Sequence, residues 1–211
     1  CSAQLERSAG AAAPMPQLPG SSPKMCVPPR LQALVALCRV LLWHDFGVRW
    51  TLPAHSLCPT VPSRLNYLLW LDDLLMGAGV ARGDHAILGI DIGTGASCIY
   101  PLLGVAHFGW RFIGTEVDAI SVAAARHNVD LNAWSKHIEI RLVESPKLNG
   151  EVEQPPPILA TVLGPTETAH FCMCNPPFYD LAEHPQSNAA ISPHARCIAT
   201  DGEQFTSGGQ V

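Results

Sequence analysis

From residue 86 onward the sequence alternates between short apolar segments and segments with helical spacing. The apolar segments predict four β-strands, at 86–91, 111–118, 137–144 and 170–175. The helical segments follow the first two strands, at 92–104 and 119–134. Strands that alternate with helices form parallel sheets, and right-handed crossovers cover both faces of such sheets. The sequence therefore predicts an α/β fold with a mostly parallel sheet.

Two further helices are predicted ahead of this region. The first covers "PPRLQALVALCRVLLWHDFG", with Pro29 near its start and Gly47 beyond its end. Pro59 and Pro62 predict an extended lead-in, because proline disfavours helix in the residue before it. The second helix is then expected over Leu65–Leu75.

The chain falls into three predicted parts. They are a flexible tail rich in Ala, Pro, Gly and Ser at 1–28, a helical extension at 29–80 and the α/β domain at 81–211. Within that domain, 145–168 and 181–211 are expected to be loops. The sequence begins with Cys1 and ends in "FTSGGQV", so we expect a piece of a longer protein whose α/β domain is truncated after the fourth strand.

Composition narrows the possible classes of protein. The formal net charge of -5 argues against a protein wrapped wholly around nucleic acid, but it allows one local basic patch. No apolar run approaches the roughly 18 residues of a membrane span. The 8 cysteines form no CxxC pair and the histidines lack zinc-ligand spacing, so we predict no metal and free thiols in a reducing compartment. No secretion signal is evident, which favours a nuclear or cytoplasmic location.

A glycine-rich turn follows the first predicted strand. In "DIGTGAS", Asp91 ends the strand, and Gly93 and Gly95 allow the backbone to approach a ligand closely. The dinucleotide fingerprint needs a third glycine, but Cys98 occupies that position, which disfavours NAD. An acidic strand end followed by Gly-x-Gly is common at the entrance to S-adenosylmethionine sites. We therefore predict this cofactor, in a Rossmann-like class I methyltransferase fold.

An acidic residue near the end of the second strand supports that prediction. Glu116 lies in "TEVD", where its carboxylate can accept two hydrogen bonds from ribose hydroxyls. A solvated loop acid is the simpler explanation of Glu116 alone. Its position one strand after the glycine-rich turn favours the cofactor role.

The fourth strand ends in "CMCNPPFYD". Prolines are excluded from central strands, so Pro176 and Pro177 must stand at the strand's end. The Asn175 side-chain carbonyl and the Pro176 main-chain carbonyl can both accept from a planar amine, and the prolines hold them rigidly. Phe178 can stack on a base taken out of its helix. These residues predict direct transfer of a methyl group to an exocyclic amine, driven by positioning of two bound partners.

Four motifs in order carry a resemblance to a known family. The segments "PTVPSRLNYLLWLDDLL", "GIDIGTGASCIYPLLG", "TEVD" and "FCMCNPPFYD" resemble the methyltransferase-like RNA N6-adenosine methyltransferases. That family includes a eukaryotic enzyme acting on a spliceosomal small nuclear RNA and a bacterial enzyme acting on large-subunit ribosomal RNA. The resemblance covers roughly residues 29–180. It implies transfer of a methyl group from S-adenosylmethionine to the N6 amine of adenosine in a structured RNA.

The resemblance also implies roles for individual residues. Arg64 would contact the carboxylate end of the cofactor, and Gly93 and Ser97 would line its methionine part. Glu116 would hold the ribose, while the segment from Asn175 to Phe178 would hold the target adenine. The predicted cofactor-binding residues also include Asp91, Gly95 and Asn175.

Two alternative functions fit parts of the same pattern. A glutamine or DNA amino-methyltransferase can use the same Asn-Pro-Pro turn, although the "RLNY" lead-in and the "CMCNPPF" context favour RNA. A non-catalytic RNA-binding fragment is the second alternative.

Overall fold

The computed structural model describes residues 29–54, 56–81, 83, 86–143, 159 and 162–175. The predictions for the tail at 1–28, for most of the loop at 145–168 and for 176–211 lie outside the described residues. Pro176, Pro177 and Phe178 belong to that last range. Structural statements below concern the described ranges.

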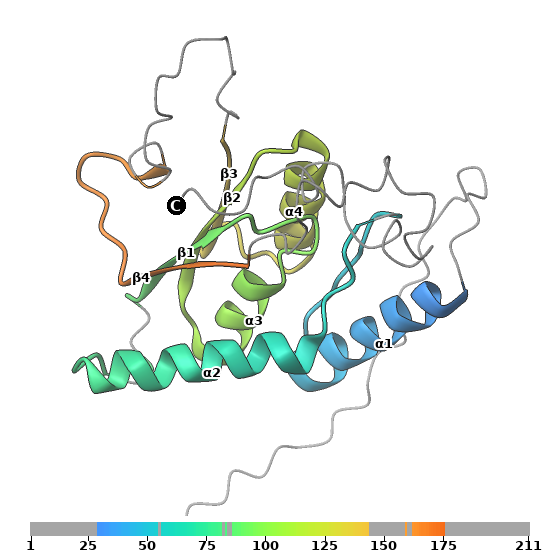
Figure 1. Ribbon diagram of the computed structural model, residues 1–211, viewed down its shortest axis with the longest axis horizontal. Helices are drawn as coiled ribbons and strands as arrows, with labels where there is room; N and C mark the ends of the chain where they lie inside the picture. Colours follow the sequence, from blue (N-terminus) through green and yellow to red (C-terminus); the bar gives the residue numbers. More distant parts are fainter. Residues whose placement is uncertain are drawn as a thin grey trace, which may run out of the picture.

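A parallel sheet forms the centre of the described region (Figure 1). Its strands are β1 (Leu88–Ile92), β2 (Arg111–Glu116), β3 (Ile138–Leu142) and β4 (Phe171–Cys174). They lie in the order β3-β2-β1-β4, and every pair of neighbours is parallel. The predicted α/β architecture is confirmed, and each strand lies within its predicted range to within one residue.

The two faces of the sheet bury different sets of side chains. Helices α3 (Ile99–Phe108) and α4 (Ala119–Leu131) connect β1 to β2 and β2 to β3, and they pack with the larger core cluster. Along β2, Phe112 belongs to this cluster, whereas the next residue, Ile113, packs with Ile90 and Val162 in a second cluster. This alternation follows from strand geometry, in which successive side chains point to opposite faces.

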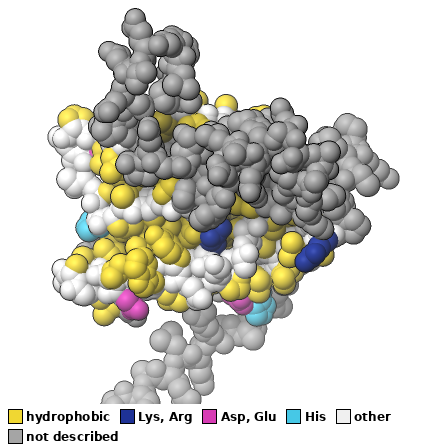
Figure 2. Space-filling model, viewed as in Figure 1, with side chains coloured by type: hydrophobic (Ala, Val, Ile, Leu, Met, Phe, Trp, Pro, Cys, Tyr) yellow, Lys and Arg dark blue, Asp and Glu magenta, His cyan; other side chains and the backbone are white. Residues whose placement is uncertain are grey.

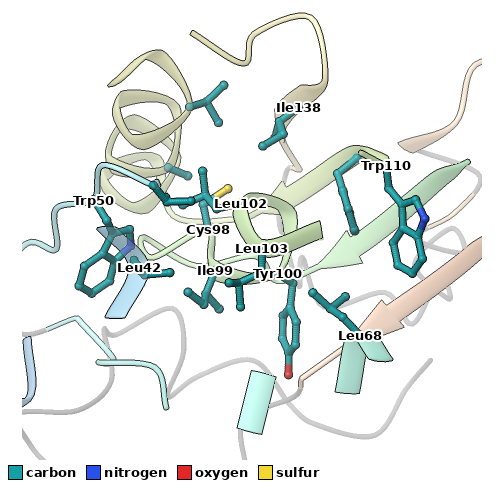
Figure 3. Close-up of a cluster of buried hydrophobic side chains, with 14 of the residues drawn as sticks. Leu42, Trp50, Leu68, Cys98, Ile99, Tyr100, Leu102, Leu103, Trp110 and Ile138 are labelled. Atoms are coloured by element: carbon teal, nitrogen blue, oxygen red, sulfur yellow. The ribbon is translucent and has the colours of Figure 1, made fainter. Parts of the chain in front are cut away.

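Helices α1 (Pro29–Phe46) and α2 (Val61–Gly77) extend the larger core (Figure 1). Leu42 from α1, Leu68 from α2 and Trp50 from the segment between them lie around α3, beside Ile99 and the other labelled side chains of Figure 3. The helical extension therefore shares its hydrophobic core with the sheet. No helix among the described residues has the length and apolar character needed to cross a membrane.

Two predicted helix starts were wrong. Helix α2 begins at Val61, so Pro62 lies in its first turn and not in an extended lead-in. The first turn tolerates proline because the missing N–H would have no partner within the helix. Helix α3 begins at Ile99, since the residues from Gly93 to Cys98 form the turn that precedes it.

The end of β2 also differs from the predicted strand. The strand stops at Glu116, and Asp118 caps the next helix. The Asp118 carboxylate accepts hydrogen bonds from the backbone N–H groups of Ile120 at 3.2 Å and Ser121 at 2.9 Å. Aspartate is a preferred N-cap because it satisfies donors that have no partner within the helix.

The surface of α2 is partly apolar. Hydrophobic side chains gather on the α2 side of the molecule (Figure 2), and on this helix Leu69, Trp70, Leu74 and Met76 are exposed. Leu68 and Leu71 on the same helix are buried. Apolar residues therefore occupy both the core-facing and the solvent-facing sides of α2.

Close packing between α3 and β2 depends on Gly104. A Cβ atom at this position would lie 2.2 Å from Cε2 of the buried Phe112 ring. Gly104→Ala should therefore lower the free energy of unfolding by about 1–3 kcal/mol, the usual cost of overpacking a core. Urea denaturation monitored by circular dichroism would measure the change.

Gly77 provides the matched control for this prediction. It lies at the exposed end of α2, and a Cβ there would meet no atom within 4 Å. Gly77→Ala should be neutral or stabilising by up to about 1 kcal/mol, because alanine favours helix. Equal stability of the two variants would contradict the close α3–β2 packing.

Candidate active site

Most of the predicted site residues meet at the carboxyl edge of the sheet. Asp91 lies near the end of β1, Glu116 ends β2 and Asn175 directly follows β4. Strand β1 lies between the other two, with Ile92 opposite both Thr115 and Cys174. Ligands of open α/β sheets bind beyond this edge.

The glycine-rich turn has a backbone that requires left-handed conformations. Gly93 and Gly95 have φ values of 72° and 64°, and Cys98 has a φ of 50°. The Thr94 N–H donates to the Thr115 carbonyl at 2.9 Å, which holds the turn against β2. Cys98, the N-cap of α3, thus adopts a left-handed conformation that residues other than glycine seldom take. Gly93 is exposed, and no atom lies within 4 Å of where its Cβ would be.

The Glu116 carboxylate binds the backbone of two turns. One oxygen, Oε2, accepts from the Gly95 N–H at 3.0 Å. The other, Oε1, accepts from the N–H groups of Val117 at 2.7 Å and Asp118 at 3.1 Å. Only 7% of the residue is exposed. A buried carboxylate is costly unless it is hydrogen-bonded, and these three donors supply that compensation.

Asp91 is a buried carboxyl group with an unused oxygen. It is 1% exposed, and its Oδ2 atom has no hydrogen-bond partner among the described residues. Burial raises the pKa of Asp91 to about 7. The Thr94 hydroxyl and the Arg64 guanidinium oppose this rise in pKa, and the Glu116 carboxylate adds to it. A buried polar atom without a partner is unusual in a folded protein.

Arg64 and Asn175 are in direct contact across the site. Arg64 Nη1 donates to Asn175 Oδ1 at 3.2 Å, although the two residues are 111 positions apart. The Arg64 Cζ atom also lies 5.4 Å from the centroid of the Tyr100 ring, within range of a cation–π interaction. Burial raises the pKa of the Tyr100 hydroxyl, and Arg64 opposes this effect. The side chain predicted to bind the cofactor therefore touches the one predicted to bind the target.

Ser97 contributes its backbone to the packing of the turn. Its carbonyl accepts from the Trp50 indole N–H at 2.8 Å. Trp50 is buried and lies beside Leu42 and Cys98 in Figure 3. The segment between α1 and α2 thus packs against the glycine-rich turn and is hydrogen-bonded to it.

Sequence reasoning missed two asparagines that fix this arrangement. Asn128, which is fully buried, bonds the backbone N–H and carbonyl of Thr51 at 2.8 and 2.9 Å and donates to the Ala96 carbonyl at 3.2 Å. Asn132, one helical turn later, bonds the N–H and carbonyl of Arg49, each at 2.8 Å. The two side chains together join helix α4, the α1–α2 segment and the glycine-rich turn. The only signal in the sequence was their four-residue spacing in "RHNVDLNAW".

The sheet order and the helices that connect its strands are those of the Rossmann-like fold of class I methyltransferases. The sequence pattern of a family described as RNA methyltransferase matches residues 29–207. This chain belongs to that family.

Individual relatives agree with this assignment. The chain is 37% identical over 199 residues to the U6 small nuclear RNA (adenine-(43)-N(6))-methyltransferase of Caenorhabditis briggsae, covering 85% of this chain and 39% of that protein. It is 39% identical over 158 residues to the ribosomal RNA large subunit methyltransferase F of Pseudomonas savastanoi, covering 74% of this chain and 45% of that protein. The chain thus spans less than half of either relative.

A solved structure shares the fold. The N-terminal domain of human METTL16 in complex with SAH is 42% identical to this chain with a TM-score of 0.59. The match covers 70% of this chain and 53% of that domain.

Asn128 provides a test of the support behind the site. Asn128→Ala leaves the Thr51 N–H, the Thr51 carbonyl and the Ala96 carbonyl without these side-chain bonds. The loss of partners for these three buried or part-buried groups should lower the free energy of unfolding by about 2–4 kcal/mol. Chemical denaturation would measure this, with Asn66→Ala on the exposed side of α2 as the control. A loss no larger than that of the control would refute the supporting role of Asn128.

Asp91 should make stability depend on pH. Its pKa is raised from the ordinary 3.8 to about 7 in the folded state, so the folded state binds the proton more tightly than the unfolded state. The resulting destabilisation is complete above about pH 7 and disappears as pH falls towards 4. Asp91→Asn should flatten stability across this range and stabilise the chain at pH 8 by about 2–4 kcal/mol.

Thermal unfolding at several pH values would check this expectation. Asp130→Asn, at an exposed position of α4, is the control and should leave the pH profile unchanged. Parallel pH profiles for the parent chain and Asp91→Asn would show that Asp91 carries no such penalty.

Proposed function

We propose that this chain carries the cofactor and target sites of an S-adenosylmethionine-dependent methyltransferase acting on the N6 amine of adenosine in a structured RNA. The observation that carries the proposal is the meeting of Arg64, Asp91 and Asn175 at one strand edge, in a chain of the RNA methyltransferase family. The same edge holds the glycine-rich turn.

The residues present fit the cofactor. The unused Asp91 oxygen is suited to a hydrogen-bond donor, above all a cationic one such as the ammonium group of a methionine moiety. Arg64 would bind its carboxylate, because a guanidinium presents two parallel donors. Gly93, Gly95 and Ser97 would line the methionine part, with open space beside Gly93. When bound, S-adenosylmethionine supplies a methyl group on a positively charged sulfur.

Glu116 is proposed to hold the ribose. Its two oxygens already accept three backbone N–H groups, and a carboxylate has about four acceptor positions. Room therefore remains for one hydroxyl donor and not for the two expected from the sequence. The backbone bonds would fix the orientation of the carboxylate before the cofactor arrives, so that little ordering is needed on binding.

Asn175 is proposed to receive the target amine. Its Oδ1 atom carries two lone pairs, so it can accept from the adenine N6 amine while it also accepts from Arg64. The interaction should strengthen as positive charge develops on the nitrogen. Pro176, Pro177 and Phe178 would complete this turn, with Phe178 stacking on the base.

RNA is the preferred substrate for two reasons. The family is described as RNA methyltransferase, and the two relatives above are named for small nuclear RNA and ribosomal RNA. These names favour a small nuclear or ribosomal RNA as the partner over the glutamine and DNA alternatives. They are compatible with a nuclear or a cytoplasmic location, and the U6 relative favours the nucleus.

The proposal predicts a selective loss of turnover in Asn175→Ala. Removing one preorganised electrostatic partner should lower kcat by roughly 10²–10³. Affinity for S-adenosylmethionine should change far less, because Asp91, Glu116 and the glycine-rich turn remain. Transfer of tritium from labelled S-adenosylmethionine to candidate RNAs, with the full-length protein, would measure kcat, and calorimetry would measure affinity.

Cys172→Ser is the control for this experiment. Cys172 is exposed on β4, three residues before Asn175. The control should keep parental kcat. Methylation of adenosine at the parental rate by Asn175→Ala would reject the amine-binding role, and the absence of methyl transfer by the parent to every RNA tested would reject the proposed activity.

A further inference from the structure

Two cysteines from different parts of the helical extension face each other. Cys38 lies on α1, Cys58 lies three residues before α2, and their sulfur atoms are 3.6 Å apart. Both are free thiols. The Sγ atoms must approach by only about 1.5 Å to reach the length of a disulfide bond, close to 2.05 Å.

The surroundings give the two sulfurs different roles. Cys38 is 5% exposed, whereas Cys58 is only half-buried. The Cys58 S–H and the Val61 N–H lower the pKa of the Cys38 thiol against the opposing effect of burial. The shared hydrogen bond with Cys38, and then burial, raise the pKa of Cys58. The Cys38 S–H donates to the Pro59 carbonyl at 3.0 Å, which leaves the Cys58 S–H as the donor between the two sulfurs. With this geometry and the directions of the two pKa shifts, we assign to Cys38 the attack on an oxidant and to Cys58 the closure of the disulfide.

We propose that Cys38 and Cys58 form a redox-sensitive pair that closes to an intrachain disulfide when the protein meets a peroxide. The Cys38 thiolate attacks one oxygen of hydrogen peroxide, so that an S–O bond forms, the O–O bond breaks and Cys38 becomes a sulfenic acid. The other oxygen leaves as hydroxide and takes a proton to become water. The Cys58 sulfur then attacks the Cys38 sulfur, the S–O bond breaks, and a second water forms. The two thiols lose two electrons and two protons to the peroxide.

The disulfide would restrain the α1–α2 segment, which is hydrogen-bonded to the glycine-rich turn and to α4. The loop between the two cysteines contains Trp50, which bonds the Ser97 carbonyl, and Thr51, which bonds Asn128. Cross-linking the ends of this loop restricts the unfolded chain more than the folded one. The oxidised protein should therefore melt several degrees higher than the reduced protein. This inference stands apart from the proposed methyl transfer.

The experiment is peptide mapping of the protein before and after peroxide treatment. Remaining thiols are alkylated, and trypsin digestion without reductant places Cys38 in peptide 31–39 and Cys58 in peptide 50–64. We expect peroxide to produce these two peptides joined with the loss of two hydrogens, and dithiothreitol to separate them. Cys172→Ser, which changes an exposed thiol, should form the same cross-link.

The serine variants at the pair itself complete the test. Cys58→Ser should give no cross-link, and its Cys38 should accumulate as sulfinic acid because no neighbouring thiol intercepts the sulfenic acid. The peroxide-induced rise in Tm should be absent in this variant. The proposal is overturned if the parent protein, treated until Cys172 is oxidised, still yields Cys38 and Cys58 as separate peptides.

Discussion

The carboxylate of Glu116 holds the candidate site together. One carboxylate oxygen accepts from the glycine-rich turn after β1, and the other accepts from the first two residues after β2. These turns follow neighbouring parallel strands, so their N–H groups point into the same space beyond the sheet edge. A neutral side chain would leave three donors with weaker partners, since hydrogen bonds to a charged acceptor are about twice as strong as neutral ones. The ribose role proposed for Glu116 thus rests on a side chain whose position is fixed by the backbone.

Support from the other side comes from the helical extension. The Asn128 and Asn132 side chains hydrogen-bond to the backbone of Thr51 and Arg49, respectively. Trp50, which lies between Arg49 and Thr51 in the sequence, donates to the Ser97 carbonyl. The same extension carries Arg64 on α2, and its helices share the core of α3. The α1–α2 segment is therefore an integral part of the folded domain. From α2, Arg64 reaches the strand edge and donates to Asn175.

The sequence predicted the parts of this arrangement that are specified locally. Hydrophobic periodicity located the four strands, and Gly93 and Gly95 located the turn because left-handed backbone favours glycine. Parallel strands then bring their carboxyl ends to one edge, so the placement of Glu116 and Asn175 at the same edge followed from topology. Pro62 was misinterpreted because proline both ends extended segments and starts helices. The contacts of Asn128 could not be predicted, since they join residues 77 positions apart and leave only an ordinary polar residue in a helix.

The contact between Arg64 and Asn175 links the two halves of the proposed reaction. In the proposed function, a cofactor carboxylate and a target amine would each bind one member of a pair that is already hydrogen-bonded. A carboxylate on the guanidinium would draw Arg64 towards the cofactor and weaken its donation to Asn175, which would leave that carbonyl more available to the amine. Asp91 would act in the opposite electrostatic sense in its ionised form, which a bound cation would favour over the protonated form. Charge on the bound cofactor would therefore adjust the acceptor strength of Asn175 through Arg64, without any movement of the sheet.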